Sequence, residues 1–153
     1  MANDAQVTMQ VTVLPDEIAK TFSASMPVTP ADDSEKWYYK KTSVSNTGSE
    51  DLIKGQFIDY TAIDNDTAPG TVHDDDEVKF LFIKNIDTNS RSITICFDGG
   101  TAASDLVDAV TIGPNESFAA RLPNTTVSNL HSKSSASTAE CIVCALIDDV
   151  AEE

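Results

Sequence analysis

Arginine and lysine are scarce in this chain. Of its 153 residues only ten are basic, two of them the arginines Arg91 and Arg121, against 25 aspartates and glutamates, for a formal net charge of −15. Nucleic-acid binding depends on basic side chains that neutralise backbone phosphates, and the densest basic stretch is the pair Lys40–Lys41. We therefore expect no nucleic-acid partner. The acidity is typical of a protein kept soluble by charge, or of one adapted to a salty medium.

Long hydrophobic runs are missing as well. No stretch approaches the roughly 20 consecutive apolar residues that a membrane-spanning helix requires. The opening MANDAQVTMQ has neither a basic patch nor an apolar block, and a secretory signal needs both. We expect no membrane partner, no secretory signal, and assembly inside a cell.

Cysteine is rare, with Cys96, Cys141 and Cys144 the three present. An odd count does not suggest a disulfide-stapled secreted scaffold. The last two have CxxC spacing, which raises the possibility of a metal or redox site. They lie, however, in the apolar run ECIVCALI, and residues three apart in a strand face opposite ways. Buried apolar cysteines are the simpler interpretation.

Catalytic signatures are also lacking. The two histidines, His73 and His131, are far apart in the sequence and neither belongs to a His-x-His pair, and no GxSxG motif is present. A Cys/His pair built on Cys96 or Cys144 remains conceivable, although each cysteine lies in an apolar β-rich run. We predict a non-enzymatic protein with no catalytic residues, no metal and no cofactor.

Acidic residues cluster at 64–66 and 73–77. Carboxylate and amide oxygens could bind a hard cation such as calcium, but the glycine and distal glutamate of an EF-hand are misplaced. Solvated acidic loops are the alternative.

Alternation of apolar and polar residues, by contrast, is abundant. In VTMQVTV, Val7, Met9, Val11 and Val13 share one face, and SITICFD shows the same period of two, which indicates strands with one buried face. The expected strands are 7–13, 21–28, 36–44, 56–63, 78–84, 91–97, 107–112, 117–122, 126–133 and 140–147. They predict an all-β, jelly-roll-like antiparallel β-sandwich, with a single domain at 6–149, a flexible N-terminal end at 1–5 and an acidic C-terminal end at 150–153.

Turn residues separate these runs. Gly113–Pro114–Asn115–Glu116 predicts a tight turn with proline in second position, joining two strands as a hairpin, and 78–100 is also interpreted as a hairpin. Asp98–Gly99–Gly100 predicts positive φ. A single helical turn beginning at Pro15–Asp16–Glu17, with Ile18 and Phe22 on one face, is the alternative to continuous β structure there.

Interface residues are predicted from two features. The run at 7–13 has no lysine or proline to guard its edge, so we expect self-association to cover it. Trp37, Tyr38 and Tyr39 could stack on sugar rings, or serve core packing on one face and an interface on the other. The predicted interface comprises Val7, Met9, Val11, Val13, Trp37, Tyr38 and Tyr39.

Three stretches in order, FLFIKNIDTNSRSITICFDGG, VTIGPNESFAARLP and NLHSKSSASTAECIVCALIDD, resemble the small β-sandwich virion proteins of marine and cyanobacterial tailed phages. Those proteins share a KN strand end, an I-x-L-D-G-G strand and a GPGES turn. Asn115 stands here where glycine is common, and asparagine tolerates the same backbone angles. The resemblance spans roughly residues 7–149, and the family offers no catalytic residues to carry over.

The resemblance implies a capsid decoration, or cement, protein that binds the outer surface of the major capsid protein lattice and stabilises it. It also admits a tail- or fibre-associated module that contacts the host surface, with glycan binding as one form of that contact. Synthesis in the host cytoplasm, a place on the capsid exterior, and assembly as a homotrimer, or alternatively a dimer, are the corresponding expectations.

Overall fold

The computed structural model describes residues 4–13, 20–58, 70–103 and 108–150, and these are almost entirely antiparallel β structure. Within them the helical segment is one 3₁₀ turn, η1 (Val127–Asn129). The predicted all-β sandwich class is confirmed. The chain divides into two compact units, Met1–Asp33 and Ser34–Glu153, so the predicted 6–149 domain comprises a hairpin unit and a sandwich unit.

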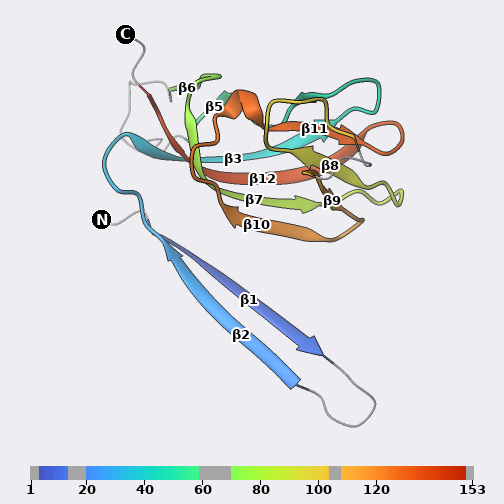
Figure 1. The fold of residues 1–153 in the computed structure, drawn as a ribbon, viewed down its shortest axis with the longest axis horizontal. Helices are drawn as coiled ribbons and strands as arrows, with labels where there is room; N and C mark the ends of the chain where they lie inside the picture. Colours follow the sequence, from blue (N-terminus) through green and yellow to red (C-terminus); the bar gives the residue numbers. More distant parts are fainter. Residues whose placement is uncertain (1–3, 14–19, 59–69, 104–107, 151–153) are drawn as a thin grey trace. The chain divides into compact units, whose positions relative to one another are not determined.

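The first unit is a long hairpin of β1 (Ala5–Val13) and β2 (Lys20–Val28) (Figure 1). The two strands pair antiparallel over nine residue pairs, from Ala5 opposite Val28 to Val13 opposite Lys20. Phe22 therefore lies in a strand rather than in a helical turn, and the remainder of the helical alternative, at 15–18, lies outside the described residues. The alternating pattern correctly located both strands, although not their separation from the sandwich.

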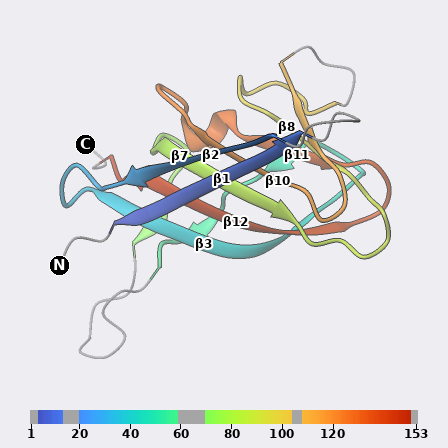
Figure 2. The same ribbon diagram turned by 90° about the horizontal axis from the view of Figure 1, so that it is seen from below.

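The second unit holds two four-stranded sheets (Figures 1 and 2). One has the order β10–β7–β12–β3 and is called here sheet I; the other has the order β4–β11–β8–β9 and is called sheet II. A short pair, β5–β6, completes the unit. The strands are β3 (Glu35–Val44), β4 (Glu50–Asp51), β5 (Gly55–Gln56), β6 (Thr71–Val72), β7 (Glu77–Asn85), β8 (Ile93–Cys96), β9 (Val110–Ile112), β10 (Ser117–Arg121), β11 (His131–Ser134) and β12 (Ala139–Asp148).

The pairing of these strands is nested. Apart from the short β5–β6 pair, the first strand of the unit pairs with the last, β3 with β12, and the second with the second-last, β4 with β11. Continuing inward, β7 pairs with β10 and β8 with β9. Folding such a ribbon of four strand pairs over on itself gives the eight-stranded, two-sheet jelly roll. The jelly-roll prediction is thus supported by topology as well as by strand content.

Two predicted hairpins are wrong. β7 belongs to sheet I and β8 to sheet II, so 78–100 crosses from one layer to the other instead of turning back beside itself. Likewise the turn at 113–116 leads from β9 in sheet II to β10 in sheet I. The residues of a turn predict that the chain changes direction, but they do not specify whether the next strand stays in the same sheet.

The core between the sheets is filled from both layers. Alternate residues along β7 and along β12 point inward, among them Leu81, Ile83, Val143 and Ala145. Sheet II contributes Ile93 and Ile95.

Two expected strands differ from the structure. β5 ends at Gln56 instead of continuing to 58, with 59–63 outside the described residues, and 126–133 holds η1 before β11 starts.

A buried polar loop carries the crossing from β7 to β8. Asn85 is fully buried, and its amide Nδ2 donates to the carbonyls of Arg91, at 2.7 Å, and Ile112, at 3.1 Å. Its Oδ1 accepts the backbone N–H of Asp87 at 3.0 Å. Since Ile112 lies in β9, one side chain fastens the end of a sheet I strand to sheet II.

Asn115 occupies the left-handed region, with a φ of 63°. It follows Pro114 in a turn closed by the N–H of Glu116, which donates to the Gly113 carbonyl at 3.1 Å. Proline in second position and positive φ in third are the requirements of a type II turn.

We expect Asn115→Gly to leave stability unchanged or slightly higher, and Asn115→Ala to lower the free energy of unfolding by about 1 kcal/mol, because a Cβ without a polar group is strained at positive φ. Urea denaturation of the two variants measures this. Equal stability of the alanine and glycine variants would contradict the assignment of strain to this residue.

Candidate interaction surfaces

The hairpin unit presents one apolar face. The register places Val7 opposite Met26, Met9 opposite Ala24, Val11 opposite Phe22 and Val13 opposite Lys20. Cross-strand partners lie on the same face, so the four predicted residues of β1 are joined by three apolar residues of β2. Towards the Val13–Lys20 end of the hairpin these side chains are strongly exposed: Met9 49%, Val11 59%, Val13 48% and Phe22 55%. Singly exposed apolar residues are ordinary, but a continuous exposed face marks an interaction surface.

The three aromatic residues of β3 have different environments. Tyr38 is fully buried in the core, where its hydroxyl donates to the Lys54 carbonyl at 3.1 Å. Burial, the main cause, raises the pKa of that hydroxyl, while the hydrogen bond partly opposes the shift. Trp37, 7% exposed, meets Phe80 edge-on, whereas Tyr39 is 57% exposed. Tyr38 must therefore be removed from the predicted interface, because a core side chain cannot reach a partner.

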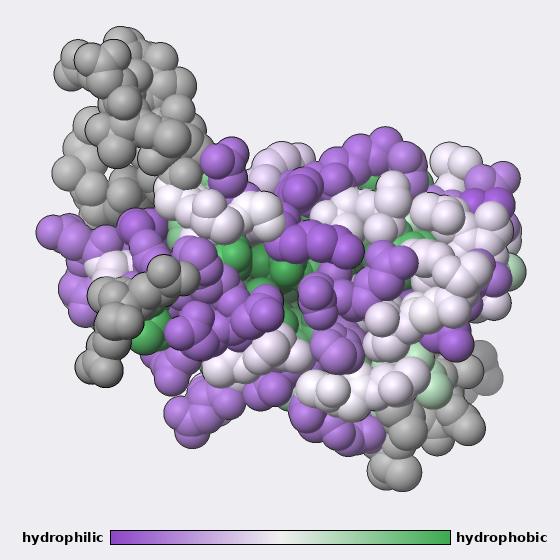
Figure 3. All heavy atoms as spheres, turned by 90° about the horizontal axis from the view of Figure 1, so that it is seen from above, coloured by the Kyte–Doolittle hydropathy of each residue, from purple (hydrophilic) through white to green (hydrophobic). Residues whose placement is uncertain are grey.

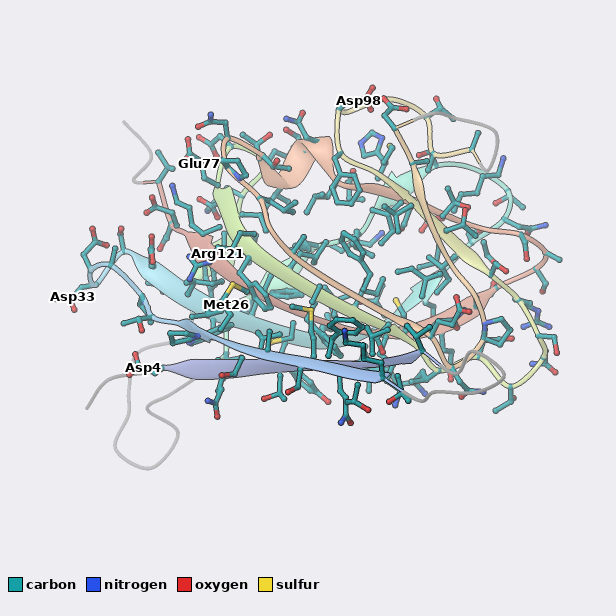
Figure 4. The ribbon with its side chains drawn as sticks, turned by 60° about the horizontal axis from the view of Figure 1, so that its bottom comes forward. Asp4, Met26, Asp33, Glu77, Asp98 and Arg121 are labelled. Atoms are coloured by element: carbon teal, nitrogen blue, oxygen red, sulfur yellow. The ribbon has the colours of Figure 1, made fainter. Side chains whose placement is uncertain are left out.

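The outer face of sheet I is apolar along its centre, which the sequence prediction missed. The registers align Trp37, Leu146 and Phe80 across three strands, and Tyr39, Cys144 and Phe82 in the next row. Basic residues flank this centre at Lys41 and Lys84, and Arg121 in β10 lies opposite Phe80 (Figure 4). Runs such as FLFI and CIVCALI, in which the residues on both faces of the strand are apolar, were the sequence signal for this apolar outer face. By contrast with the outer face of sheet I, the face of the molecule shown in Figure 3 carries mainly hydrophilic residues.

Cys96 and His131 are brought together, although not as an activated pair. They lie opposite each other in β8 and β11. The Cys96 thiol donates to the Gly100 carbonyl at 3.0 Å, and the His131 ring bonds the same oxygen through Nδ1 at 2.8 Å. Burial raises the pKa of this thiol. A nucleophilic cysteine needs a lowered pKa and a base that accepts its proton, whereas here the pKa is raised and the thiol and the His131 ring both bond the Gly100 carbonyl.

The CxxC cysteines face opposite sides of β12, as predicted. Cys141 is buried in the core, and burial raises the pKa of its thiol to about 12; Cys144 lies on the outer face, with a pKa also raised by burial. The pair therefore does not converge on one ion. Within the described residues, no group of three or more histidine, cysteine, aspartate or glutamate side chains is arranged to hold a metal.

The acidic run 73–77 is only partly a solvated loop. Asp76 is fully buried, and its carboxylate accepts the backbone N–H of His73 at 2.8 Å and of Val150 at 3.0 Å. Burial, outweighing these hydrogen bonds, raises its pKa. Asp76 thus anchors the chain after β12 to the turn before β7. The other acidic loop, 64–66, lies outside the described residues.

Asp87 shows the opposite shift. Burial would raise the pKa of its carboxyl, but hydrogen bonds from the N–H groups of Arg91 and Asn89, with the Arg91 charge, outweigh burial and lower it. A lowered folded-state pKa gives stability that is present above the unfolded pKa of about 4 and is lost as pH falls through the folded value.

We therefore expect Asp87→Asn to destabilise the protein at pH 7, and the deficit to shrink as the pH falls below about 4. Urea denaturation of both proteins between pH 7 and pH 3 measures the difference. A deficit that stays constant over this range would show that the charge of Asp87 contributes nothing.

Comparison with known proteins found no matching family model, no similar curated protein and no similar solved structure. In the described part of the chain, no helix has the length and apolar character to cross a membrane. The structural features above therefore carry the functional argument.

Proposed function

We propose that this chain is a virion structural protein that decorates a capsid, binding the outer surface of the major capsid protein lattice and stabilising it. Three features support the proposal. The nested eight-stranded jelly roll is a fold that viral capsid proteins share with lectins and cupins. The net charge of −15 suits a protein displayed at high density on dispersed particles. The sequence resemblance to phage virion proteins points the same way.

The observation that carries most weight is the exposed apolar face of the hairpin unit. A two-stranded hairpin is marginally stable by itself in water, yet this one spans nine residue pairs with large apolar side chains exposed. Such a segment gains stability when another surface covers it. A protein that completes its structure on an assembly is expected to have a segment of this kind, whereas catalysis has no need of one.

Copy number tests the proposal. We expect the protein in purified virions at a fixed ratio to the major capsid protein, measured by quantitative mass spectrometry, and we expect purified protein to rebind particles that lack it. Recovery in a few copies per virion, in the tail fraction, would refute decoration and favour the tail or fibre module.

One observation favours the tail or fibre module: Tyr39 presents an exposed aromatic ring on the outer face of sheet I. Trp37 is covered and so is a poor stacking platform. Binding to a glycan array that is lost in Tyr39→Ala and kept in Lys41→Ala would support host-surface contact.

The assembly proposed with decoration is a homotrimer, with a dimer as the alternative; the two-fold contact between hairpins argued below corresponds to the dimer. Deleting residues 1–14 would remove β1 and leave β2 unpaired. Point substitutions on the hairpin face are therefore the sharper test of its role.

A further inference from the structure

The two strands of the hairpin differ from the remainder of the chain in charge. Among the 18 residues of β1 and β2, Lys20 is the one charged side chain, in a protein of net charge −15. One face is apolar except at its last row, where Lys20 lies opposite Val13 with its ammonium 5.5 Å from the centroid of the Phe22 ring. The other face consists of hydroxyl and amide side chains such as Thr8, Gln10, Thr12, Thr21 and Ser23. The centres of protein interfaces are depleted in charge in this way.

We propose that the apolar face of this hairpin docks against the same face of a second copy of the chain. Two copies of so acidic a protein repel each other over most of their surfaces, and the repulsion is weakest where the strands carry no acidic side chain. The hairpin strands are therefore where two copies can meet with the least electrostatic repulsion. A basic partner would gain nothing specific from a face without acidic groups.

Side-chain sizes on this face are self-complementary. Phe22 is paired with Val11, and in the adjacent row the small Ala24 is paired with Met9. A two-fold axis that runs across the strands between these rows places Phe22 of one copy over Ala24 of the other. The same operation places Val11 over Met9. Phe22 of each copy thus meets the small Ala24 of the other, which is the reciprocal pairing of an isologous contact.

The size of the face predicts a weak contact. Nine residue pairs at about 3.4 Å per residue, over two strands about 4.8 Å apart, give at most roughly 300 Å² per copy, because Val28 at one end of the face is already buried. Two copies together would bury at most about 600 Å², against the roughly 1,200 Å² that stable complexes need. Association should therefore depend on concentration and strengthen where copies are held close together.

Sedimentation velocity over a wide concentration range tests the contact. We expect the wild-type protein to shift from the monomer towards twice the monomer mass as concentration rises, and Phe22→Asp to remain monomeric. Thr21→Asp adds the same charge to the opposite face of the same strand and should associate as the wild type does. A wild-type protein that stays monomeric, a Phe22→Asp variant that still dimerises, or equal loss in both variants would overturn the proposal.

Disulfide trapping tests the geometry. With Met9→Cys and Val11→Cys in one chain, we expect a covalent dimer on oxidation, because these positions face each other across the two-fold axis. The matched control is Gln10→Cys with Thr12→Cys, and the unaltered chain gives the background from Cys144. Equal dimer yield from the two pairs would contradict the face assignment.

The proposal does not depend on capsid binding. A monomeric Phe22→Asp protein that still occupies particles fully would leave decoration intact, whereas a dimer that binds no particle would refute decoration alone.

Discussion

Truncating Leu81 to alanine is expected to lower the free energy of unfolding by about 4 kcal/mol, near the top of the range for buried leucines. Leu81 is fully buried in β7, and its partners in the adjacent strands are Ala145 and Ala120. Neighbours that small cannot move in to fill the space, so the cavity stays open and its cost is not relieved. Domains commonly have 5–15 kcal/mol of total stability, so this variant should be close to unfolding.

Denaturant titration followed by tryptophan fluorescence measures the effect, with Trp37 as the reporter. Lys84→Ala, exposed in the same strand, is the matched control and should change stability by less than about 0.5 kcal/mol. Leu81→Met, which nearly conserves volume, should cost less than about 1.5 kcal/mol. A loss below about 2 kcal/mol for the alanine variant would show that the sheets can close over the space.

Replacing Asn85 by alanine is expected to cost about 3–5 kcal/mol, because it leaves three backbone groups without their partners, each worth about 1–3 kcal/mol when buried. These are the carbonyls of Arg91 and Ile112 and the N–H of Asp87. At roughly 3 °C per kcal/mol, the melting temperature should fall by about 10–15 °C.

Asn85→Asp separates hydrogen bonding from packing. It keeps the shape but removes both N–H donors and sets a carboxylate against two carbonyl oxygens, so at pH 7 it should be at least as damaging as alanine. Thr88→Ala, at an exposed position in the same loop, is the control and should be neutral. An aspartate variant as stable as the wild type would refute the role given to the amide.

Strand positions were largely predictable, because a period of two records one buried and one exposed face. The assignment of each strand to one of the two sheets was not predictable. The nearest turn fixes how the chain changes direction, whereas the sheet that β8 or β10 joins depends on partners far away in the sequence. At 126–133, Val127 and Leu130 are both buried at a spacing of three, which fits a 3₁₀ turn. In a strand, residues three apart lie on opposite faces, so a period of two would not bury both side chains on one face.

The apolar face of the hairpin was half recoverable from sequence. The apolar face of β1 was evident, but its partners Phe22, Ala24 and Met26 became part of the surface only once the hairpin register was known. The separation of the two units had a signal in TPADDS, where one proline and two aspartates follow the hairpin. Tyr38 was misassigned because adjacent aromatic residues in a strand alternate between faces, and sequence alone does not say which face is core.

The nested pairing of the sandwich has a consequence for how the chain acquires its structure. β12, the last described strand in chain order, lies between β7 and β3 in sheet I. Until it emerges from the ribosome, β3 lacks the neighbour it has in the finished sheet, and the β7–β10 pair lacks its inner edge partner. Contacts at such long sequence separation require costly loop closure before any compensating burial, which slows folding to milliseconds or seconds in proteins of this kind. Closure of sheet I therefore waits for this ten-residue strand to be made.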